Sequence, residues 1–290
     1  MKKIISKEDN SVNFVFGEEK DNYFESRYVR RKDDYIVCYI SVKKGCSKGC
    51  KFCHLTTTNQ ISEEDATIEE ILEQAQAVYD HYLEVVESGA EKKARLVHFN
   101  FMARGEPLNS KVILNNNEEL FIKLSNIFKD LRPKYNISTI MPKSLGSKKL
   151  TDIFKHITPT IYYSLYSVQE DFREEWLPNA LPVDKAFQNL KEYQSDTKKI
   201  IKLHHTLIKD ANDNMENAIL IANIIEKYKL LIEYQIVRYN SFSENEGEET
   251  EEKNIEAFLT QLKVLMPSYD IKMINRVGQD VYASCGMFYY

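Results

Sequence analysis

The feature that most constrains this chain is a regular alternation of strand and helix patterns along most of its length. YIVCYISV at 35–42 is an unbroken apolar run typical of a buried strand. Six strand patterns follow it, each preceded by a helical pattern, at 95–102, 135–140, 159–167, 199–208, 230–239 and 269–275. Short strand–helix–strand connections imply parallel strands joined by right-handed crossovers. The sequence therefore predicts an α/β protein built as a (β/α)6 barrel, whole or partial, with its chemistry at the carboxyl ends of the strands.

The segment before this array has a different pattern. SVNFVF at 11–16 and YFESRYV at 23–29 flank the polar stretch GEEKDN, which is the signal of a β-hairpin. We therefore expect two parts, an N-terminal β-hairpin extension over residues 1–34 and a barrel with a C-terminal tail over residues 35–290.

Charge and hydropathy limit the classes of partner. The 290 residues include 39 Lys and Arg against 44 Asp and Glu, a net charge of −5, so no global field attracts nucleic acid. No apolar run approaches the roughly 18 residues that a membrane span needs. The start MKKIISKEDN turns polar before a signal segment could form, so we expect a cytoplasmic protein with no membrane partner.

Three of the five cysteines lie within eight residues, as Cys46, Cys50 and Cys53. Such crowding in a chain without a signal segment indicates metal ligation or redox chemistry rather than a disulfide framework. Three thiolates from one loop can hold one face of an iron–sulfur cube and leave its fourth iron open. Zinc is the alternative, but structural zinc usually takes four ligands in two pairs, and His54 is too close to Cys53 to complete a good tetrahedron.

The Cys-x3-Cys-x2-Cys motif, with Phe52 before its last cysteine, resembles the signature of the radical S-adenosylmethionine (SAM) superfamily. The resemblance implies a partial (β/α)6 radical SAM barrel with a [4Fe–4S] cluster on the three cysteines and Phe52 beside the cofactor. It also implies SAM bound to the open iron, where an electron from the cluster cleaves it to a 5′-deoxyadenosyl radical.

Other segments, in order from about residue 12 to 290, resemble the RlmN/Cfr family of RNA adenine methyltransferases. They are ARGEPLN at 103–109, IST at 137–139, YSLYS at 163–167, IVRYN at 236–240 and VGQDVYASCGM at 277–287. The resemblance implies that SAM is contacted by Gly105, Glu106, Ser138, Ser164 and Asn240. Glu106 is then the acceptor for the SAM amino group.

Two cysteines remain for catalysis under this resemblance. Cys285 matches the cysteine that is methylated by one SAM and then carries the methyl group as the radical site. Cys38 is expected to resolve the covalent adduct by forming a disulfide with it. The family usually places this second cysteine seven residues before the first cluster ligand, whereas Cys38 lies eight before Cys46. Because one residue turns a strand side chain to the opposite face, Cys38 is alternatively a buried thiol without a catalytic role.

The family's N-terminal helical domain is absent from this sequence, and Arg104 and Tyr166 stand where the family has Met and His. The sequence thus predicts a radical SAM methyltransferase acting on C2 or C8 of adenine in RNA, either tRNA or rRNA, with an electron donor such as flavodoxin or ferredoxin. Residues 30–51 carry seven Lys and Arg against two Asp, which is either a phosphate-binding patch or a set of solvated lysines. A radical SAM enzyme acting on a peptide or small molecule is the alternative function.

Overall fold

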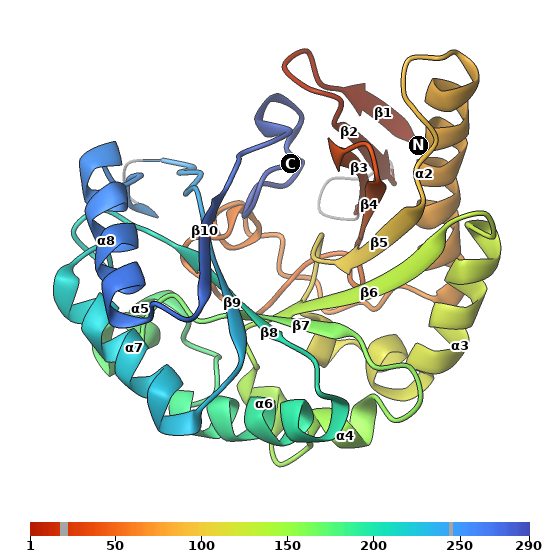
Figure 1. The fold of residues 1–290 in the computed structure, drawn as a ribbon. Helices are drawn as coiled ribbons and strands as arrows, with labels where there is room; N and C mark the ends of the chain where they lie inside the picture. The colour runs from red at the N-terminus through yellow and green to blue at the C-terminus, as the bar shows by residue number, and fades with distance from the viewer. Residues whose placement is uncertain (18–22, 244–245) are drawn as a thin grey trace.

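The fold is one continuous ten-stranded sheet curved into an open barrel with helices on its outer side (Figure 1). The computed structural model describes residues 1–17, 23–243 and 246–290. The strands pair in sequence order, from β1 at one edge to β10 at the other. They are β1 (Lys2–Ile5), β2 (Val12–Phe16), β3 (Phe24–Lys32), β4 (Tyr35–Ile40), β5 (Leu96–Phe101), β6 (Arg132–Thr139), β7 (Thr160–Ser164), β8 (Ile201–Thr206), β9 (Ile232–Val237) and β10 (Asp270–Ile274).

Strands β4 to β10 are parallel to one another, and a helical connection lies between each consecutive pair. The longer helices are α2 (Ile68–Glu87), α3 (Lys111–Ile127), α6 (Val183–Thr197), α7 (Met215–Tyr228) and α8 (Glu252–Leu265). Short helical segments are α1 (His54–Thr57), η1 (Pro107–Asn109), η2 (Lys143–Leu145), α4 (Leu150–Ile153), α5 (Glu170–Trp176) and η4 (Gln279–Val281). The predicted partial barrel is therefore confirmed.

The N-terminal strands β1 to β3 pair antiparallel and join the barrel through an antiparallel β3–β4 pair. Val12 pairs with Tyr28 and Phe16 with Phe24, as expected for the two strands of the predicted hairpin. Residues 18–22 of its turn lie outside the described residues. Strand β1 has no counterpart among the sequence predictions, because its KKII pattern is too short to identify.

Helix α3 begins earlier than its pattern indicated. The apolar spacing predicts a helix over 117–131, whereas α3 covers Lys111–Ile127 with non-helical dihedral angles at Asn116. Three consecutive asparagines, Asn115 to Asn117, interrupt the apolar periodicity, and asparagine favours local hydrogen bonds over helix. The buried Asn117 side chain donates to the Ile113 and Ile153 carbonyls, at 2.9 and 3.0 Å, so its amide is satisfied despite burial.

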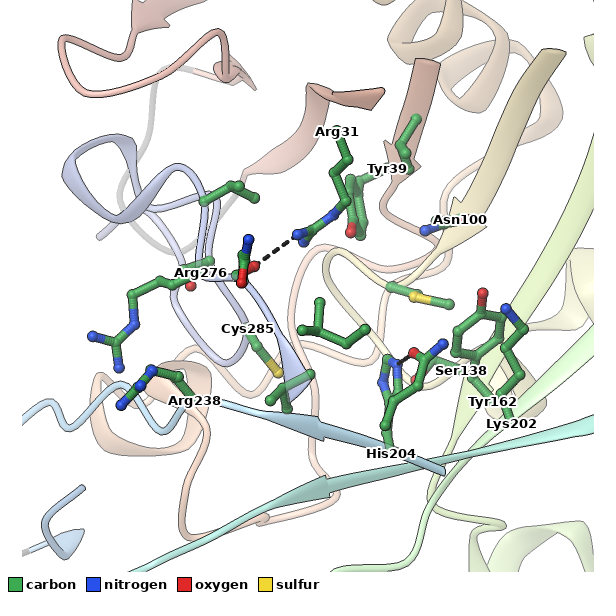
Figure 2. A pocket seen from close by; sticks show the side chains of 18 of the residues that line it. Arg31, Tyr39, Asn100, Ser138, Tyr162, Lys202, His204, Arg238, Arg276 and Cys285 are labelled. Atoms are coloured by element: carbon green, nitrogen blue, oxygen red, sulfur yellow. Dashed lines mark hydrogen bonds between the residues drawn. The ribbon is translucent and has the colours of Figure 1, made fainter. Parts of the chain in front are cut away.

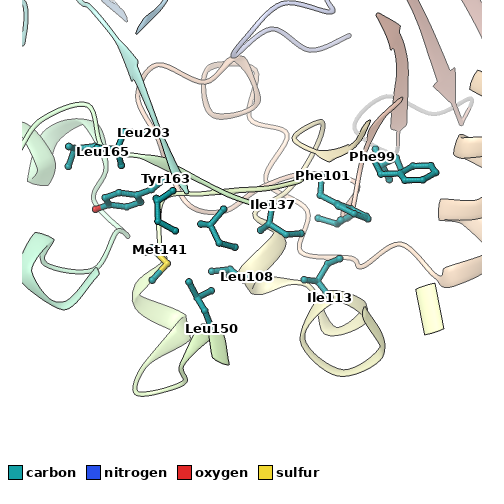
Figure 3. Close-up of a cluster of buried hydrophobic side chains, with 14 of the residues drawn as sticks. Phe99, Phe101, Leu108, Ile113, Ile137, Met141, Leu150, Tyr163, Leu165 and Leu203 are labelled. Atoms are coloured by element: carbon teal, nitrogen blue, oxygen red, sulfur yellow. The ribbon is translucent and has the colours of Figure 1, made fainter. Parts of the chain in front are cut away.

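The main core lies between the outer face of the sheet and the helices, as the cluster in Figure 3 illustrates. Alternate residues of each parallel strand point into it, for example Phe99 and Phe101 on β5 and Ile137 on β6. The other alternate residues face the barrel interior. This division decides which side chains can reach a ligand.

Candidate active site

The three clustered cysteines lie on a loop at the carboxyl end of β4, where barrel chemistry is expected. We call residues 43–60 the cysteine loop. Two backbone bonds fix its shape, from Cys46 N to the Gln60 carbonyl and from Cys53 N to the Cys50 carbonyl, both 3.0 Å. A Cβ on Gly45 would lie 2.4 Å from the Gln60 carbonyl oxygen, so the loop can close only around glycine.

The three thiols influence one another's protonation. Burial raises the pKa of Cys46 to about 12 and of Cys53 to about 11, and that of Cys50 well above its usual value. The negative charge of neighbouring thiolates raises the pKa of Cys46 and Cys50 further. Three adjacent thiolates need a positively charged metal centre to be stable here. Three thiols without a fourth protein ligand in the loop suit a cluster with one open iron better than a structural zinc, which usually takes four.

Glu106 follows β5 and sits at the same end of the barrel. Its carboxyl oxygens accept from Leu108 N at 3.0 Å and from Ile140 N at 3.1 Å, so it ties the β5 and β6 ends together. Burial raises the pKa of Glu106 to about 7, although the Thr139 hydroxyl and the two amides lower it. Before it, Gly105 has φ +92°, and a Cβ there would lie 2.7 Å from Lys43 Cβ.

A cavity of about 610 Å³ fills the barrel interior (Figure 2). Barrel interiors of this class are usually packed with branched apolar side chains. Here polar side chains line it, including Asn100, Ser138, Ser164 and Gln235, together with Cys285. The cavity therefore brings together the two predicted serines and the predicted methyl-carrying cysteine.

Cys285 lies in the tail, residues 275–290, beside the cysteine loop. His54 N donates to the Gly286 carbonyl at 2.9 Å. The thiol is exposed to the cavity. Enclosure by protein raises its pKa, while the positive charges of Arg27 and Arg31 lower it. Its negative charge in turn contributes to the raised pKa of Cys53.

Asn240 holds the backbone of this tail. Its Nδ2 donates to the Ser284 hydroxyl at 3.0 Å and to the Cys285 carbonyl at 2.8 Å. Its Oδ1 is buried without a hydrogen-bond partner among the described residues. Buried acceptors are normally hydrogen-bonded, and a ligand hydroxyl beside Cys285 would supply the donor that this one lacks.

Phe52 packs against the wall of the cavity. Its ring stacks on Tyr166 with centroids 4.3 Å apart and 16° between the planes. Tyr166 lines the cavity, so the stacked pair connects the cysteine loop to β7. Phe52, Gly105, Glu106 and Asn240 are not among the cavity-lining residues, although Phe52 and Asn240 contact residues that are.

The structure does not bring Cys38 to Cys285. Its neighbours Val37 and Tyr39 on β4 line the cavity, and Cys38 points the opposite way into the core between Ile36 and Ile40. It is fully buried, and burial raises its pKa far above the usual value. The one-residue offset is thus not absorbed within β4, and the cavity-facing position seven residues before Cys46 is occupied by Tyr39.

The predicted basic patch of residues 30–51 is divided. Lys43 pairs with Glu63 and Asp65, and Lys44 pairs with Glu64. Lys48 pairs with Glu63, and Lys51 pairs with Glu175. The interpretation of these lysines as a phosphate site therefore gains no support from their surroundings. Positive charge gathers in the cavity instead, whose lining includes one carboxylate, Glu233, and eight cationic side chains: Arg27, Arg30, Arg31, Lys32, Lys202, Arg238, Lys272 and Arg276.

The sequence patch included Arg30, Arg31 and Lys32 of β3, but it missed Arg27 and the cations on or just after β8, β9 and β10. A signal existed in the first half of β3, where the charged Glu25 and Arg27 alternate with Phe24, Ser26 and Tyr28 and so share one face of the strand. Charged residues repeating with period two in a buried strand indicate a polar interior.

Comparison with known proteins agrees with this geometry. No protein-family model matches the chain. A probable dual-specificity RNA methyltransferase RlmN from Clostridium beijerinckii is 27% identical over 282 residues, covering 96% of this chain and 73% of the relative. Its namesake from Clostridium botulinum strain Loch Maree is 28% identical, covering 99% of this chain and 78% of the relative.

Over nearly its whole length the chain is similar to these RlmN proteins. A radical SAM methyltransferase from Sphaerobacter thermophilus has the same fold, with a TM-score of 0.79 at 17% identity over 99% of this chain and 80% of that one. Methylornithine synthase is a more distant fold neighbour, with a TM-score of 0.52 at 12% identity over 83% of this chain and 64% of that one.

Radical SAM methyltransferases use a [4Fe–4S] cluster and SAM, and the residues of this chain fit both. The cysteine loop supplies three thiols from one turn, and Glu106 and Asn240 supply a buried carboxyl and an orphaned acceptor nearby. No helix within the described residues is long and apolar enough to cross a membrane.

Proposed function

We propose that this protein methylates C2 or C8 of an adenine in RNA through a methyl group carried on Cys285. Cys46, Cys50 and Cys53 would hold the cluster, and Phe52, Gly105, Glu106, Ser138, Ser164 and Asn240 would surround SAM. The cluster and SAM would supply the methyl group and the radical. The observation that carries the proposal is Cys285 itself, a thiol exposed to the cavity and held against the cysteine loop.

The chain's own residues have defined tasks in this proposal. Cys285 must attack as a thiolate, and Arg27 and Arg31 favour that form because they lower its pKa. Glu106 would accept from the SAM amino group, a charge-assisted contact made by a buried carboxyl. Asn240 would keep the Cys285 carbonyl in place while its free Oδ1 accepts from SAM.

An RNA substrate is favoured by the cavity's excess of cationic over acidic side chains, because phosphate contacts dominate RNA affinity. The names of the relatives agree with it. Reduction of the cluster requires an electron-donor protein, for which flavodoxin or ferredoxin is the proposed class. The resolving role of Cys38 gains no support from its place in the core.

The test is the modified-nucleoside profile of RNA from cells that express the protein. We expect 2-methyladenosine or 8-methyladenosine with the wild type and neither with Cys285→Ala. Mass spectrometry of the wild-type tail peptide should also find one added methyl on Cys285. An unmethylated Cys285 with an unchanged RNA profile would refute the proposal and leave a peptide or small molecule as the substrate class.

A further inference from the structure

The tail that carries Cys285 is held by a buried group of charges. Glu25 and Arg27 lie on β3, and Arg104 follows β5. Arg104 is fully buried and Arg27 nearly so. Arg104 Nε donates to Glu25 Oε1 at 2.6 Å, and Arg27 Nη2 donates to Glu25 Oε2 at 3.3 Å. We call these three residues the tail clamp.

Both arginines of the clamp donate hydrogen bonds to backbone carbonyls of the tail. Arg27 donates to the Ser284 carbonyl at 3.5 Å and to the Met287 carbonyl at 2.6 Å. Cys285 lies between these two contacts. Arg104 Nη2 donates to the Tyr289 carbonyl at 2.5 Å, and Glu25 accepts from Tyr289 N at 3.1 Å.

Arg104 also reaches the cysteine loop. Arg104 Nη1 donates to the Lys44 carbonyl at 2.7 Å and its Nη2 to Gln60 Oε1 at 2.6 Å. One guanidinium therefore joins the segment that carries the three cluster cysteines to the segment that carries Cys285. A planar guanidinium with five fixed donors can do this, whereas the unbranched thioether of Met has no donor.

The clamp also explains the position of the N-terminal strands. Asn13 on β2 donates to Glu25 Oε2 at 2.9 Å and to the Val281 carbonyl at 3.0 Å. Near the start of β2, Asp9 accepts from Gly278 N at 2.7 Å. In Figure 1 the tail lies between β10 and the strands β1 to β4. The extension thus forms the surface on which the tail rests.

We propose that Arg27 and Arg104, joined through Glu25, are positioning residues that hold Cys285 in the cavity at a fixed distance from the cysteine loop. The inference rests on the proposed function of Cys285. Neither arginine touches the reacting atoms, and each acts through the tail backbone. Transfer to a carrier thiol requires that thiol to be held within about 0.5 Å of its productive position, which a free tail cannot achieve.

Two variants test the clamp without leaving a buried charge unpaired. Arg104→Met leaves Glu25 paired with Arg27, and Arg27→Met leaves it paired with Arg104, so both variants should fold. Arg95→Ala is the control, because Arg95 is exposed and pairs only with Asp34 among its recorded ion pairs. Thermal unfolding and iron content of the reconstituted proteins verify that all three retain fold and cluster.

The first measurement is hydrogen–deuterium exchange of the peptides covering residues 277–290. Loss of hydrogen bonds from a charged donor should speed tail exchange by about tenfold to a hundredfold in both Met variants. Exchange in α6 and α7 should not change, and Arg95→Ala should match the wild type. Tail exchange at the wild-type rate in both Met variants would overturn the clamp.

The second measurement is the rate of methyl incorporation into Cys285, compared with SAM binding in the same holoenzyme. We expect incorporation to fall by about tenfold or more while SAM affinity stays unchanged, and Arg104→Lys to recover part of the rate. Methyl incorporation at the wild-type rate in a variant with a loosened tail would overturn the positioning role. A loosened tail in the variants, with no methyl on wild-type Cys285, would refute the proposed function but leave the clamp as a structural device.

Discussion

Glu106 shows how one buried carboxyl couples the site to pH. Its pKa is raised to about 7 by burial, from an ordinary value of 4.5. The folded protein therefore keeps a proton at pH 5 to 7 that the unfolded chain releases, so stability falls as pH rises through this window. The full effect amounts to about 2–4 kcal/mol of unfolding free energy above pH 7.

Replacing this carboxyl by a neutral amide should remove that pH dependence. In cluster-free protein, Glu106→Gln should flatten the unfolding free energy between pH 5 and 8 relative to the wild type, as measured by urea titration. Glu192→Gln is the control, because this exposed carboxylate on α6 pairs with Lys149 at the surface. Parallel wild-type and Glu106→Gln curves would mean that Glu106 stays ionised in the folded protein.

Cys38 is the residue at which the sequence resemblance and the strand geometry disagree. Since its thiol lies in the core behind β4, Cys38→Ala should turn over at nearly the wild-type rate. The substitution should lower the free energy of unfolding by about 1 kcal/mol, because it empties a small volume in the core. A stalled enzyme with substrate attached through Cys285 would instead show that β4 rearranges to deliver Cys38.

Among the elements, the turn after β5 depends on a glycine for two separate reasons. Gly105 has φ +92°, and a Cβ there would lie 2.7 Å from Lys43 Cβ. Gly89, after α2, has φ +76° but would meet nothing within 4 Å. Gly105→Ala should therefore lower the free energy of unfolding by several kcal/mol beyond the cost of backbone strain. Gly89→Ala, which carries the strain without the overlap, should lower it by only about 1 kcal/mol.

Comparing the two variants by thermal unfolding separates backbone strain from steric overlap. We also expect Gly105→Ala to weaken SAM binding, because the shift moves Glu106 out of line with the amides of Leu108 and Ile140. Equal losses of stability in the two variants would show that Lys43 moves aside without cost.

The barrel elements could be predicted from sequence because each repeats a local pattern. Strands β4 to β10 read as apolar runs and the helices as amphipathic stretches, so the spacing of hydrophobic residues alone identified these elements. The cysteine loop was found because its ligand spacing is local as well. Helix α3 was placed too late, since its first turns contain Asn115 and Asn116 rather than an apolar face.

Contacts between distant parts of the chain could not be predicted in this way. Arg104 meets Tyr289 across 185 positions, and Arg27 meets Met287 across 260. Nothing in the local pattern around Arg104 indicates such a partner. The face of β4 that carries Cys38 was also undetermined, because a bulge in the following loop could have reversed it. The pairing of β4 with β3 and β5 settles that question.

At the scale of the whole molecule, a net charge of −5 coexists with a positive interior. Six of the eight cavity cations are paired with carboxylates. Four of them are Arg27 with Glu25, Arg30 with Glu91, and Arg238 and Arg276 with Glu249. Lys202 and Lys272 share Glu233. Arg31 donates to the Asn275 carbonyl, so its charge is not neutralised by that contact (Figure 2). Within the described part of the chain, Arg31 and Lys32 are the cavity cations outside these ion pairs, so the surplus positive charge lies at the end of β3.

This distribution predicts a modest salt dependence of RNA binding, concentrated at one place. Each phosphate neutralised by a cation contributes a slope of about −0.7 to −0.9 in a plot of log affinity against log salt. Arg31→Ala and Lys32→Ala, at the end of β3, should each reduce the slope measured with an RNA stem-loop by about 1. Lys123→Ala, an exposed lysine of α3 paired with Glu119, should leave it unchanged. Identical slopes for all three variants and the wild type would place the RNA on another surface of the protein.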